Sequence, residues 1–235
     1  MILRERTALV VGSSGGIGRA TALHLARAGA RVIAISRDGA SPGDEVLSGG
    51  GFCLALDLEN EVEIGRVVCE LLGELGKGPD LLVNAAGVFD LALLAETTIQ
   101  SFDRQIAVNL RAPFLLLRAL LPAMMELDSA RVVHIGSVAG RNAYPRNGAY
   151  SASKFGLRGL HEVLLEETRG TTVAPTLIEP GAVNTPLWDP FDPDADPNLP
   201  ARAAMLSPDD VAEAIVFVAS RPVGVRIPYL PVHPA

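Results

Sequence analysis

Residues 7 to 18 of the chain read Thr-Ala-Leu-Val-Val-Gly-Ser-Ser-Gly-Gly-Ile-Gly. The apolar run Thr7–Val11 predicts a buried strand, and apolar positions after it recur at helical spacing as far as Gly29. Glycines between a strand and a helix allow a tight turn and let the backbone approach a pyrophosphate at the helix N-terminus. The stretch therefore predicts the opening of a dinucleotide-binding βαβ unit. Its predicted cofactor contacts are Gly12, Ser14, Gly16, Ile17 and Gly18.

Apolar runs alternate with helix-period stretches along the rest of the chain. Seven runs predict strands, at Thr7–Gly12, Arg31–Ser36, Gly51–Asp57, Leu81–Asn84, Arg131–Gly136, Thr172–Glu179 and Arg226–Leu230. Most of these runs are apolar throughout, which is typical of strands buried on both faces. We therefore expect an α/β fold with a doubly wound sheet of about seven mostly parallel strands and helices on both faces.

The composition narrows the class of protein. The chain has 235 residues, 49% of them hydrophobic, and a formal net charge of −7. This length and apolar content suit a single domain over residues 1–235. The acidic balance argues against a nucleic-acid or anionic-membrane partner and favours a small molecule. We find no signal-peptide pattern and no apolar stretch of spanning length, so we expect a cytoplasmic protein.

One segment breaks the alternating pattern. Residues Leu187–Ser207 are rich in proline and aspartate, which predicts little regular structure and fits a disordered surface loop equally well. Trp188 and Phe191, however, give the segment apolar anchors that a plain linker lacks. We interpret residues 187–207 as a mobile lid, which with Tyr144 predicts a partly apolar substrate pocket.

Tyr150 and Lys154 are the strongest catalytic candidates. In the run Tyr-Ser-Ala-Ser-Lys they stand four residues apart, which places phenol and ammonium on one face of a helix. The chain has two lysines against eighteen arginines, so a lysine at this position indicates a site that needs a compact cation. The pair predicts a proton-transfer site. An ordinary solvent-exposed side-chain pair on a surface helix is the alternative.

These motifs follow one another in a known order. The spacing Gly-xxx-Gly-x-Gly is followed by Asn84-Ala-Ala-Gly87, Asn109, Ser137, Tyr150-xxx-Lys154 and Pro180-Gly181. Over residues 7–186 the sequence resembles the short-chain dehydrogenase/reductase family. The resemblance implies a Rossmann-like fold and an oxidoreductase that transfers hydride between a nicotinamide and a carbonyl or alcohol carbon. Val11 and Ala85 depart from the family pattern, which usually has threonine and a second asparagine there.

The resemblance also implies the role of each catalytic residue. Tyr150 is the acid/base, and Lys154 assists it as a nearby cation that also contacts the nicotinamide ribose. Ser137 hydrogen-bonds the substrate oxygen. Asn109 holds a water that links Lys154 to solvent. Further implied cofactor contacts are Asp57, Leu58, Asn84, Ala85, Ala86, Gly87, Tyr150, Lys154, Pro180, Gly181 and Thr185.

The end of the second predicted strand bears on the choice of cofactor. An acidic residue there would hold the ribose 2′-hydroxyl of NAD, whereas Ser36 and Arg37 favour the 2′-phosphate of NADP. Asp38 leaves NAD possible, because its carboxylate could accept the ribose hydroxyls instead. We therefore predict NADP, with NAD as the alternative.

Other interpretations stay open. A non-catalytic nucleotide-binding regulator or redox sensor of the same fold would be expected to lack Tyr150 or Lys154, and a nucleotide-sugar epimerase to have a longer C-terminal region. His134 lies in an apolar strand and is interpreted as a packed core histidine. Cys53 and Cys69 are interpreted as buried thiols, and no metal is predicted. The resemblance implies a homodimer or homotetramer formed through two long helices, at about residues 101–127 and 150–169.

Overall fold

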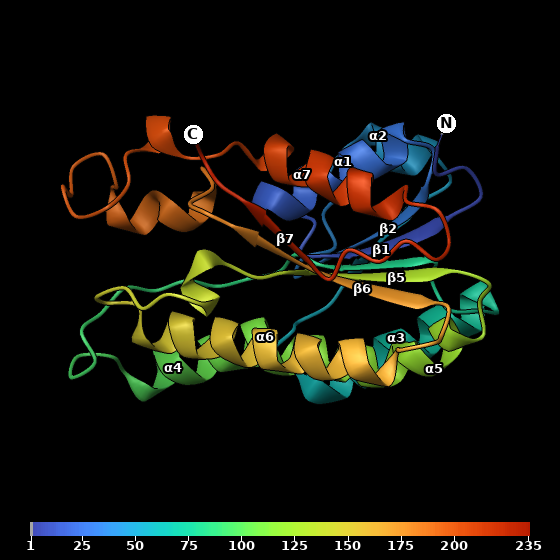
Figure 1. The fold of residues 1–235 in the computed structure, drawn as a ribbon, viewed down its shortest axis with the longest axis horizontal. Coiled ribbons are helices and arrows are strands. Elements are labelled where there is room, and N and C mark those ends of the chain that lie inside the picture. Colours follow the sequence, from blue (N-terminus) through green and yellow to red (C-terminus); the bar gives the residue numbers. More distant parts are fainter. Residues whose placement is uncertain (1) are drawn as a thin grey trace.

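A seven-stranded parallel sheet forms the centre of the protein (Figure 1), which we describe over residues 2–235 of a computed structural model. Its strands are β1 (Thr7–Val11), β2 (Arg31–Ser36), β3 (Phe52–Ala55), β4 (Leu81–Asn84), β5 (Ala130–Ile135), β6 (Val173–Pro180) and β7 (Tyr229–Val232). Their order is β3-β2-β1-β4-β5-β6-β7, so the direction of winding reverses between β1 and β4. Open α/β sheets bind ligands at such a switch point, at the C-terminal ends of the strands. The predicted fold class is confirmed.

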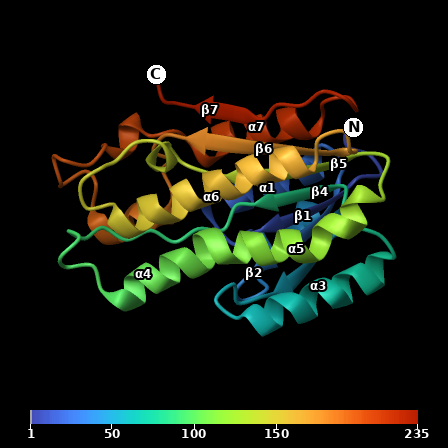
Figure 2. The ribbon, with the colours of Figure 1, turned by 60° about the horizontal axis from the view of Figure 1, so that its bottom comes forward.

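Helices cover both faces of the sheet (Figures 1 and 2). One face carries α1 (Gly16–Arg27), α2 (Asp44–Ser48) and α7 (Pro208–Ala219), and the other carries α3 (Glu61–Leu75), α4 (Ile99–Ile106), α5 (Ala112–Met125) and α6 (Gly148–Glu167). Two apolar clusters fill the layers between helices and sheet. Because successive strand residues point to opposite faces, neighbours such as Val132 and Val133 belong to different clusters.

Three sequence predictions need correction. The helix expected at about residues 101–127 is interrupted by a π-helical turn, Ala107–Arg111, between α4 and α5. Together, α4, the π-helical turn and α5 form one helical stretch, Ile99–Met125. It is long and apolar enough to span a membrane by length and composition, so the prediction that no such stretch exists is wrong. Of the 18 most apolar consecutive residues in this stretch, 44% are buried inside the protein, because the stretch packs against α3 and α6. Cys69 is exposed on α3, not buried as predicted, while Cys53 is half-buried.

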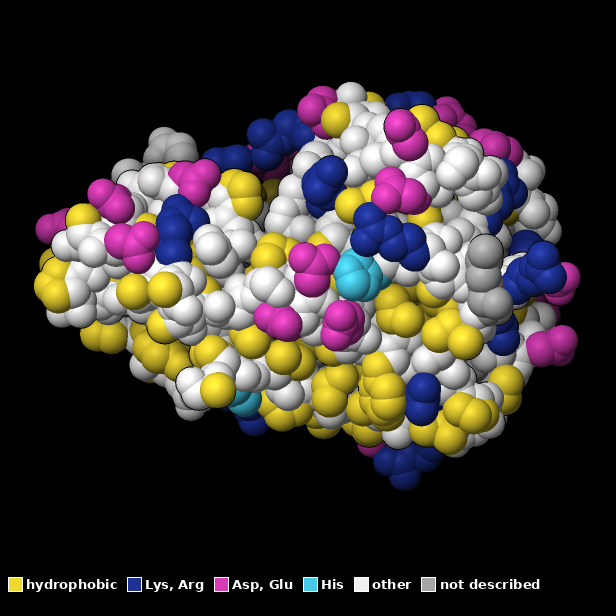
Figure 3. Space-filling model, turned by 90° about the horizontal axis from the view of Figure 1, so that it is seen from above, with side chains coloured by type: hydrophobic (Ala, Val, Ile, Leu, Met, Phe, Trp, Pro, Cys, Tyr) yellow, Lys and Arg dark blue, Asp and Glu magenta, His cyan; other side chains and the backbone are white. Residues whose placement is uncertain are grey.

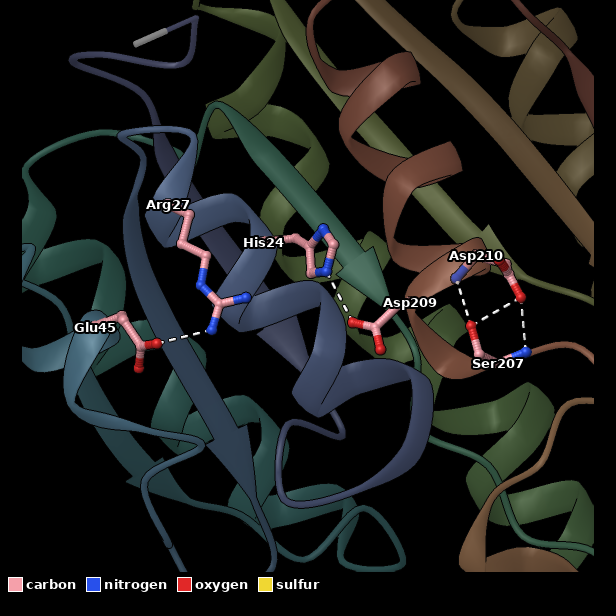
Figure 4. Close-up of polar contacts among 6 residues, drawn as sticks. All are labelled: His24, Arg27, Glu45, Ser207, Asp209 and Asp210. Carbon is pink, nitrogen blue, oxygen red and sulfur yellow. Dashed lines mark hydrogen bonds and ion pairs between the residues drawn. The ribbon is translucent and has the colours of Figure 1, made fainter.

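Polar contacts tie α1, the helix of the glycine turn, to its neighbours (Figure 4). His24 on α1 contacts Asp209 on α7 at 2.8 Å, and Arg27 pairs with Glu45 on α2, also at 2.8 Å. Ser207 caps the start of α7 in a reciprocal arrangement with Asp210. The N-terminus of α7 is therefore well defined at the point where the predicted lid segment ends.

The segment predicted as a lid contains two short 3₁₀ turns, Pro186–Phe191 and Arg202–Ala204. A bridge between Val183, four residues before the segment, and Leu206, near its end, brings the chain on either side together. Two ion pairs hold it in place: Arg202 contacts Asp189 within the segment at 2.7 Å, and Arg146 contacts Asp196 at 2.9 Å. Figure 3 shows the resulting lobe beside the body of the molecule, with a hollow between them.

Candidate active site

A single cavity of about 1260 Å³ lies along the C-terminal ends of the strands. It begins at the glycine turn and β2, crosses the ends of β4 and β5, and reaches the lid segment. Most of the predicted site residues line it: Gly12, Ser14, Gly16, Ile17, Ser36, Arg37, Asp57, Leu58, Ala85, Ala86, Gly87, Ser137, Tyr150, Lys154, Pro180, Gly181 and Thr185. Residues far apart in the chain therefore meet in one elongated site that is large enough for a dinucleotide and a small second molecule.

The glycine turn fits a pyrophosphate. A Cβ at Gly12 would lie 2.5 Å from the backbone of Ala86, and Gly12 has a φ of +90°, so no side chain is accommodated there. A Cβ at Gly18 would lie 2.0 Å from the carbonyl oxygen of Gly12. Helix α1 starts after Gly15, and no side chain among residues 2–235 caps its first amide groups. These free N–H groups and the positive end of the helix dipole suit an anion.

The end of β2 presents one free cation to the cavity. Arg37 is exposed and forms no hydrogen bond or ion pair with any of residues 2–235. Ser36 was predicted to favour a 2′-phosphate, but its hydroxyl already donates to the carboxylate of Asp38 at 3.0 Å. The Asp38 carboxylate also accepts from the N–H of Ala40, and these two hydrogen bonds, that of Ala40 first, lower the pKa of Asp38. Arg37 is therefore the group available to a 2′-phosphate.

Tyr150 and Lys154 lie on the first turns of α6 and face the cavity together. The Lys154 ammonium is buried, lies 5.7 Å from the centre of the Tyr150 ring and donates to the carbonyl oxygen of Ile135 at 2.9 Å. Burial lowers the pKa of Lys154 to about 8. Burial raises the pKa of Tyr150, and a hydrogen bond with Ser137 acts in the opposite direction. The phenol is therefore a protonated acid at neutral pH in this structure. Burial dominates its pKa, and Lys154 is not among the groups that shift it, in contrast to the expected lowering.

Ser137 follows β5 and precedes a short 3₁₀ turn, Val138–Gly140. Its Oγ accepts a hydrogen bond from the N–H of Ala139 at 3.1 Å, which fixes the direction of the side chain. The turn is held against β6, because Arg141 contacts Glu179 at 3.4 Å. Glu179 is almost fully buried, and Arg158 on α6 pairs with it at 2.7 Å. The segments that carry Ser137 and Tyr150 therefore share one buried carboxylate.

Asn109 is buried in the π-helical turn. Its amide group donates to the carbonyl oxygen of Val88 at 2.9 Å and to Oγ of Ser153 at 3.0 Å, and its Oδ1 accepts from the N–H of Val88 at 2.8 Å. Single π-helical turns inside α-helices are frequent at functional sites. Here the turn brings Asn109 against the loop that follows β4.

Three predicted residues lie behind the cavity wall. Gly18 is beneath the glycine turn, and Asn109 supports the wall through Val88. Asn84 directs its amide towards the ring of His134, at 3.2 Å from Nδ1. His134 is fully buried beside His161, as predicted for a core histidine, and burial lowers the pKa of His134 to about 3 and that of His161 to about 4.

Phe89 is a site residue that sequence reasoning missed. It lies in the loop after β4, and its ring makes edge-on contacts with Tyr150, Trp188 and Phe191, at centroid distances of 4.8, 5.0 and 5.3 Å. The only signal in the sequence is its position two residues after Gly87. Leu91 and His233 also line the cavity without having been predicted, and Leu199 and Pro200 line it from the segment predicted as a lid.

Comparison with known proteins agrees with this geometry. The family model for short chain dehydrogenases matches residues 6–196. D-threitol dehydrogenase of Mycolicibacterium smegmatis is 35% identical over 231 residues, which cover 93% of this chain and 87% of that protein. The 3-oxoacyl-[acyl-carrier-protein] reductase of a Synechocystis strain is 29% identical and covers 96% of this chain and 93% of its own length.

Solved structures agree in fold over nearly the whole chain. A metagenomic short-chain oxidoreductase in complex with NADP is 33% identical, with a TM-score of 0.84 over 100% of this chain and 99% of its own. A putative NAD(P)-dependent gluconate 5-dehydrogenase from Beutenbergia cavernae with bound NADP is also 33% identical, with a TM-score of 0.86 over 98% and 96% of the two chains. With this sequence match, this fold and this arrangement of residues, the chain belongs to the short-chain dehydrogenase family and is an oxidoreductase.

Proposed function

We propose that the protein is an NADP-dependent oxidoreductase that interconverts a carbonyl compound and its alcohol, with Tyr150 as the acid/base. The observation that carries this proposal is the convergence of Tyr150, Lys154 and Ser137 on one wall of a cavity that also contains the glycine turn. A nicotinamide dinucleotide, when bound, supplies or accepts the hydride. The chain has to supply the proton, a place for the substrate oxygen and shelter from water.

Each of these tasks has a residue suited to it. The protonated phenol of Tyr150 donates its proton to the substrate oxygen during reduction, and the raised pKa of Tyr150 keeps that proton available at neutral pH. The hydroxyl of Ser137, already directed by Ala139, hydrogen-bonds the same oxygen as negative charge develops on it. The buried ammonium of Lys154 stabilises the phenolate that remains. Asn109 is proposed to hold a water that resupplies the proton.

The cofactor preference rests on Arg37. This guanidinium is exposed at the cavity wall and has no partner among residues 2–235, so it is free for a charge-assisted hydrogen bond to a 2′-phosphate. The carboxylate of Asp38 is turned towards Ser36 and the N–H of Ala40. NADP is bound by two of the structurally similar proteins, and NADH by a 3-ketoacyl-(acyl-carrier-protein) reductase from Brucella melitensis.

A second copy of the chain is the proposed macromolecular partner. Helices α4 and α5 run end to end beside α6 on one face of the molecule (Figure 2). Large apolar side chains on these helices are exposed: Ile99, Phe102, Phe114, Phe155 and Val163. Exposed apolar patches of this kind are typical of association surfaces. The opposite face has acidic and basic side chains mixed over its surface (Figure 3), which does not suit nucleic acid. A cytoplasmic location is part of the same proposal.

The experiment has two stages. The purified protein is first titrated with NADPH and NADH, and binding is followed by quenching of Trp188. It is then mixed with the reduced cofactor and a panel of aldehydes and ketones, and loss of the reduced nicotinamide is followed by absorbance. Binding with turnover supports the proposal. Tight binding without turnover of any carbonyl or alcohol would instead favour a regulator or redox sensor of the same fold.

A further inference from the structure

We infer that the substrate is an uncharged carbonyl compound with a flat aromatic group next to the carbonyl carbon, and that Phe89 is the residue that positions this group. The inference rests on the proposed function and adds a substrate class to it. The reaction would reduce an aryl aldehyde or ketone: the carbonyl carbon gains hydride from the reduced nicotinamide and the oxygen gains the proton of Tyr150.

Phe89 is the centre of the aromatic end of the cavity. Its ring meets Tyr150, Trp188 and Phe191 at interplanar angles of 74°, 66° and 73°, so one side chain contacts both the catalytic residue and the lid. Edge-to-face contacts at these distances are favourable and directional. A substrate whose oxygen reaches Tyr150 and Ser137 therefore has its substituents close to the rings of Phe89 and Trp188.

Phe89 and Trp188 are held in these positions by hydrogen bonds to backbone atoms. The indole N–H of Trp188 donates to the carbonyl oxygen of Val183 at 3.1 Å. The backbone of Val88, next to Phe89, is hydrogen-bonded on both its N–H and its carbonyl oxygen by Asn109. With the lid closed, these contacts give the aromatic wall a defined shape that favours a flat group. Leucine and proline side chains extend the wall: Leu91, Pro145, Leu187, Leu199 and Pro200.

Two arginines near the lid, Arg146 in the cavity lining and Arg202 outside it, are already paired. The guanidinium of Arg146 contacts Asp196 at 2.9 Å, and that of Arg202 contacts Asp189 at 2.7 Å and Asn184 at 2.8 Å. A carboxylate or phosphate on the substrate would have to displace Asp196 to pair with Arg146. A polyol would leave hydroxyl groups against the aromatic and proline side chains of this wall, where they lose hydrogen bonds to water. An uncharged aryl compound incurs neither cost.

The test compares three aldehydes that differ in ring, charge and hydroxyl content. Benzaldehyde is the aryl probe, para-carboxybenzaldehyde adds only a negative charge, and glyceraldehyde replaces the ring by hydroxyl groups. For the unaltered protein we expect kcat/KM for benzaldehyde to exceed that for the other two by at least about tenfold. A preference for glyceraldehyde or for the carboxylate would overturn the inference and leave the proposed function standing.

Two variants test the role of Phe89. Phe89→Leu keeps an apolar side chain, so the fold should survive, but it removes the aromatic contacts. Loss of one such pair should lower kcat/KM for benzaldehyde about 2- to 12-fold and change that for glyceraldehyde less than about twofold. Phe217→Leu, on the exposed side of α7, is the matched control and should change neither value. An equal loss for both aldehydes in Phe89→Leu would overturn the positioning role.

A binding measurement distinguishes failure of this inference from failure of the proposed function. Benzamide resembles the aryl probe but its amide carbonyl is not reduced, and Trp188 is the chain's only tryptophan, so its fluorescence reports occupancy without turnover. Quenching of Trp188 by benzamide, weakened in Phe89→Leu, supports the aryl site even if no aldehyde is turned over, in which case the proposed function alone fails. Absence of quenching together with absence of benzaldehyde turnover would overturn the inference.

Discussion

The amide group of Asn109 forms two hydrogen bonds with the backbone of one residue, Val88: it donates to the carbonyl oxygen at 2.9 Å and accepts from the N–H at 2.8 Å. Asn109 therefore fixes the loop after β4 in addition to any part it has in proton transfer. An asparagine inside a helix is mildly unfavourable, and these contacts are the compensating gain. The loop fixed in this way leads directly to Phe89 in the cavity wall.

The first prediction follows from this contact. In Asn109→Asp the carboxylate cannot donate to Val88 or to Ser153, so buried acceptors lose their partners. We expect the free energy of unfolding to fall by about 2 to 4 kcal/mol and the turnover of aryl substrates to fall with it. Chemical denaturation measures the first effect. The exposed amide-to-acid change Gln100→Glu is the control, and equal stability of both variants would contradict the structural role.

The second prediction concerns cofactor choice. Because Arg37 is free at the cavity wall, the unaltered protein should bind NADP about 10 to 100 times more tightly than NAD, and Arg37→Asp should reverse the order. Asp38→Asn removes a nearby negative charge and should strengthen NADP binding further. Equilibrium titration of both cofactors measures these values, with the exposed Arg118→Asp on α5 as the control. Equal affinity of the unaltered protein for NADP and NAD would refute the role of Arg37.

The third prediction is a loss of stability in mild acid. Burial lowers the pKa of His134 to about 3 and that of His161 to about 4, whereas both histidines titrate near 6.5 when unfolded. The unfolded chain therefore binds more protons below pH 6.5, so stability is fully present above that pH and falls as the pH drops towards the folded values. At pH 5 the loss should be about 2 kcal/mol for each histidine.

Urea denaturation at pH 5, 6, 7 and 8 measures how the free energy of unfolding depends on pH. His134→Asn and His161→Gln each remove one titrating ring, so each variant should lose about half as much stability between pH 7 and pH 5 as the unaltered protein. Between pH 7 and pH 8 these histidines are neutral in both states, so neither variant should change the pH dependence of stability there. Variants with the full slope of the unaltered protein would show that the two histidines are not its cause.

The fourth prediction concerns the lid, residues 187–207. We expect it to be mobile without ligand and to close over the nicotinamide end when substrate binds, which excludes water from the hydride path. Arg146→Gln removes the ion pair with Asp196 and should raise the rate of proteolysis within the segment. Oxidised cofactor with benzamide should slow this cleavage and change Trp188 fluorescence. If saturating ligand changes neither the cleavage rate of residues 187–207 nor the fluorescence of Trp188, the segment is not a lid.

Local patterns are enough to predict the sheet and most of the cavity wall. Buried parallel strands are continuous apolar runs, and their C-terminal ends meet at one edge, so the sequence alone assigns residues such as Gly12 and Tyr150 to one site. The remaining features depend on contacts between distant segments. The π-helical turn at Asn109 and the edge contacts of Phe89 arise from partners that no local pattern identifies. The hydrogen bond of the Ser36 hydroxyl to Asp38, in contrast, is a local contact between residues two apart.

Burial explains the other differences between the sequence predictions and the structure. The pKa values of Tyr150 and Lys154 are governed in the structure by removal from water, whereas their spacing alone predicts a simple attraction between phenolate and ammonium. Cys69 lies in an apolar run but on the outer side of α3. In each case the sequence identifies the residue, while its environment depends on how the layers pack.

The central claim is that Tyr150 moves the proton, and the turnover of Tyr150→Phe tests it most directly. The substitution keeps the ring and its contact with Phe89 and removes only the hydroxyl group. With saturating NADPH and the carbonyl probe that the unaltered protein reduces fastest, turnover should fall by at least about 100-fold, while NADPH binds with unchanged affinity. Tyr229→Phe, on β7, should keep full turnover. Near-normal turnover in Tyr150→Phe would contradict the account, because a different group would then have to supply the proton.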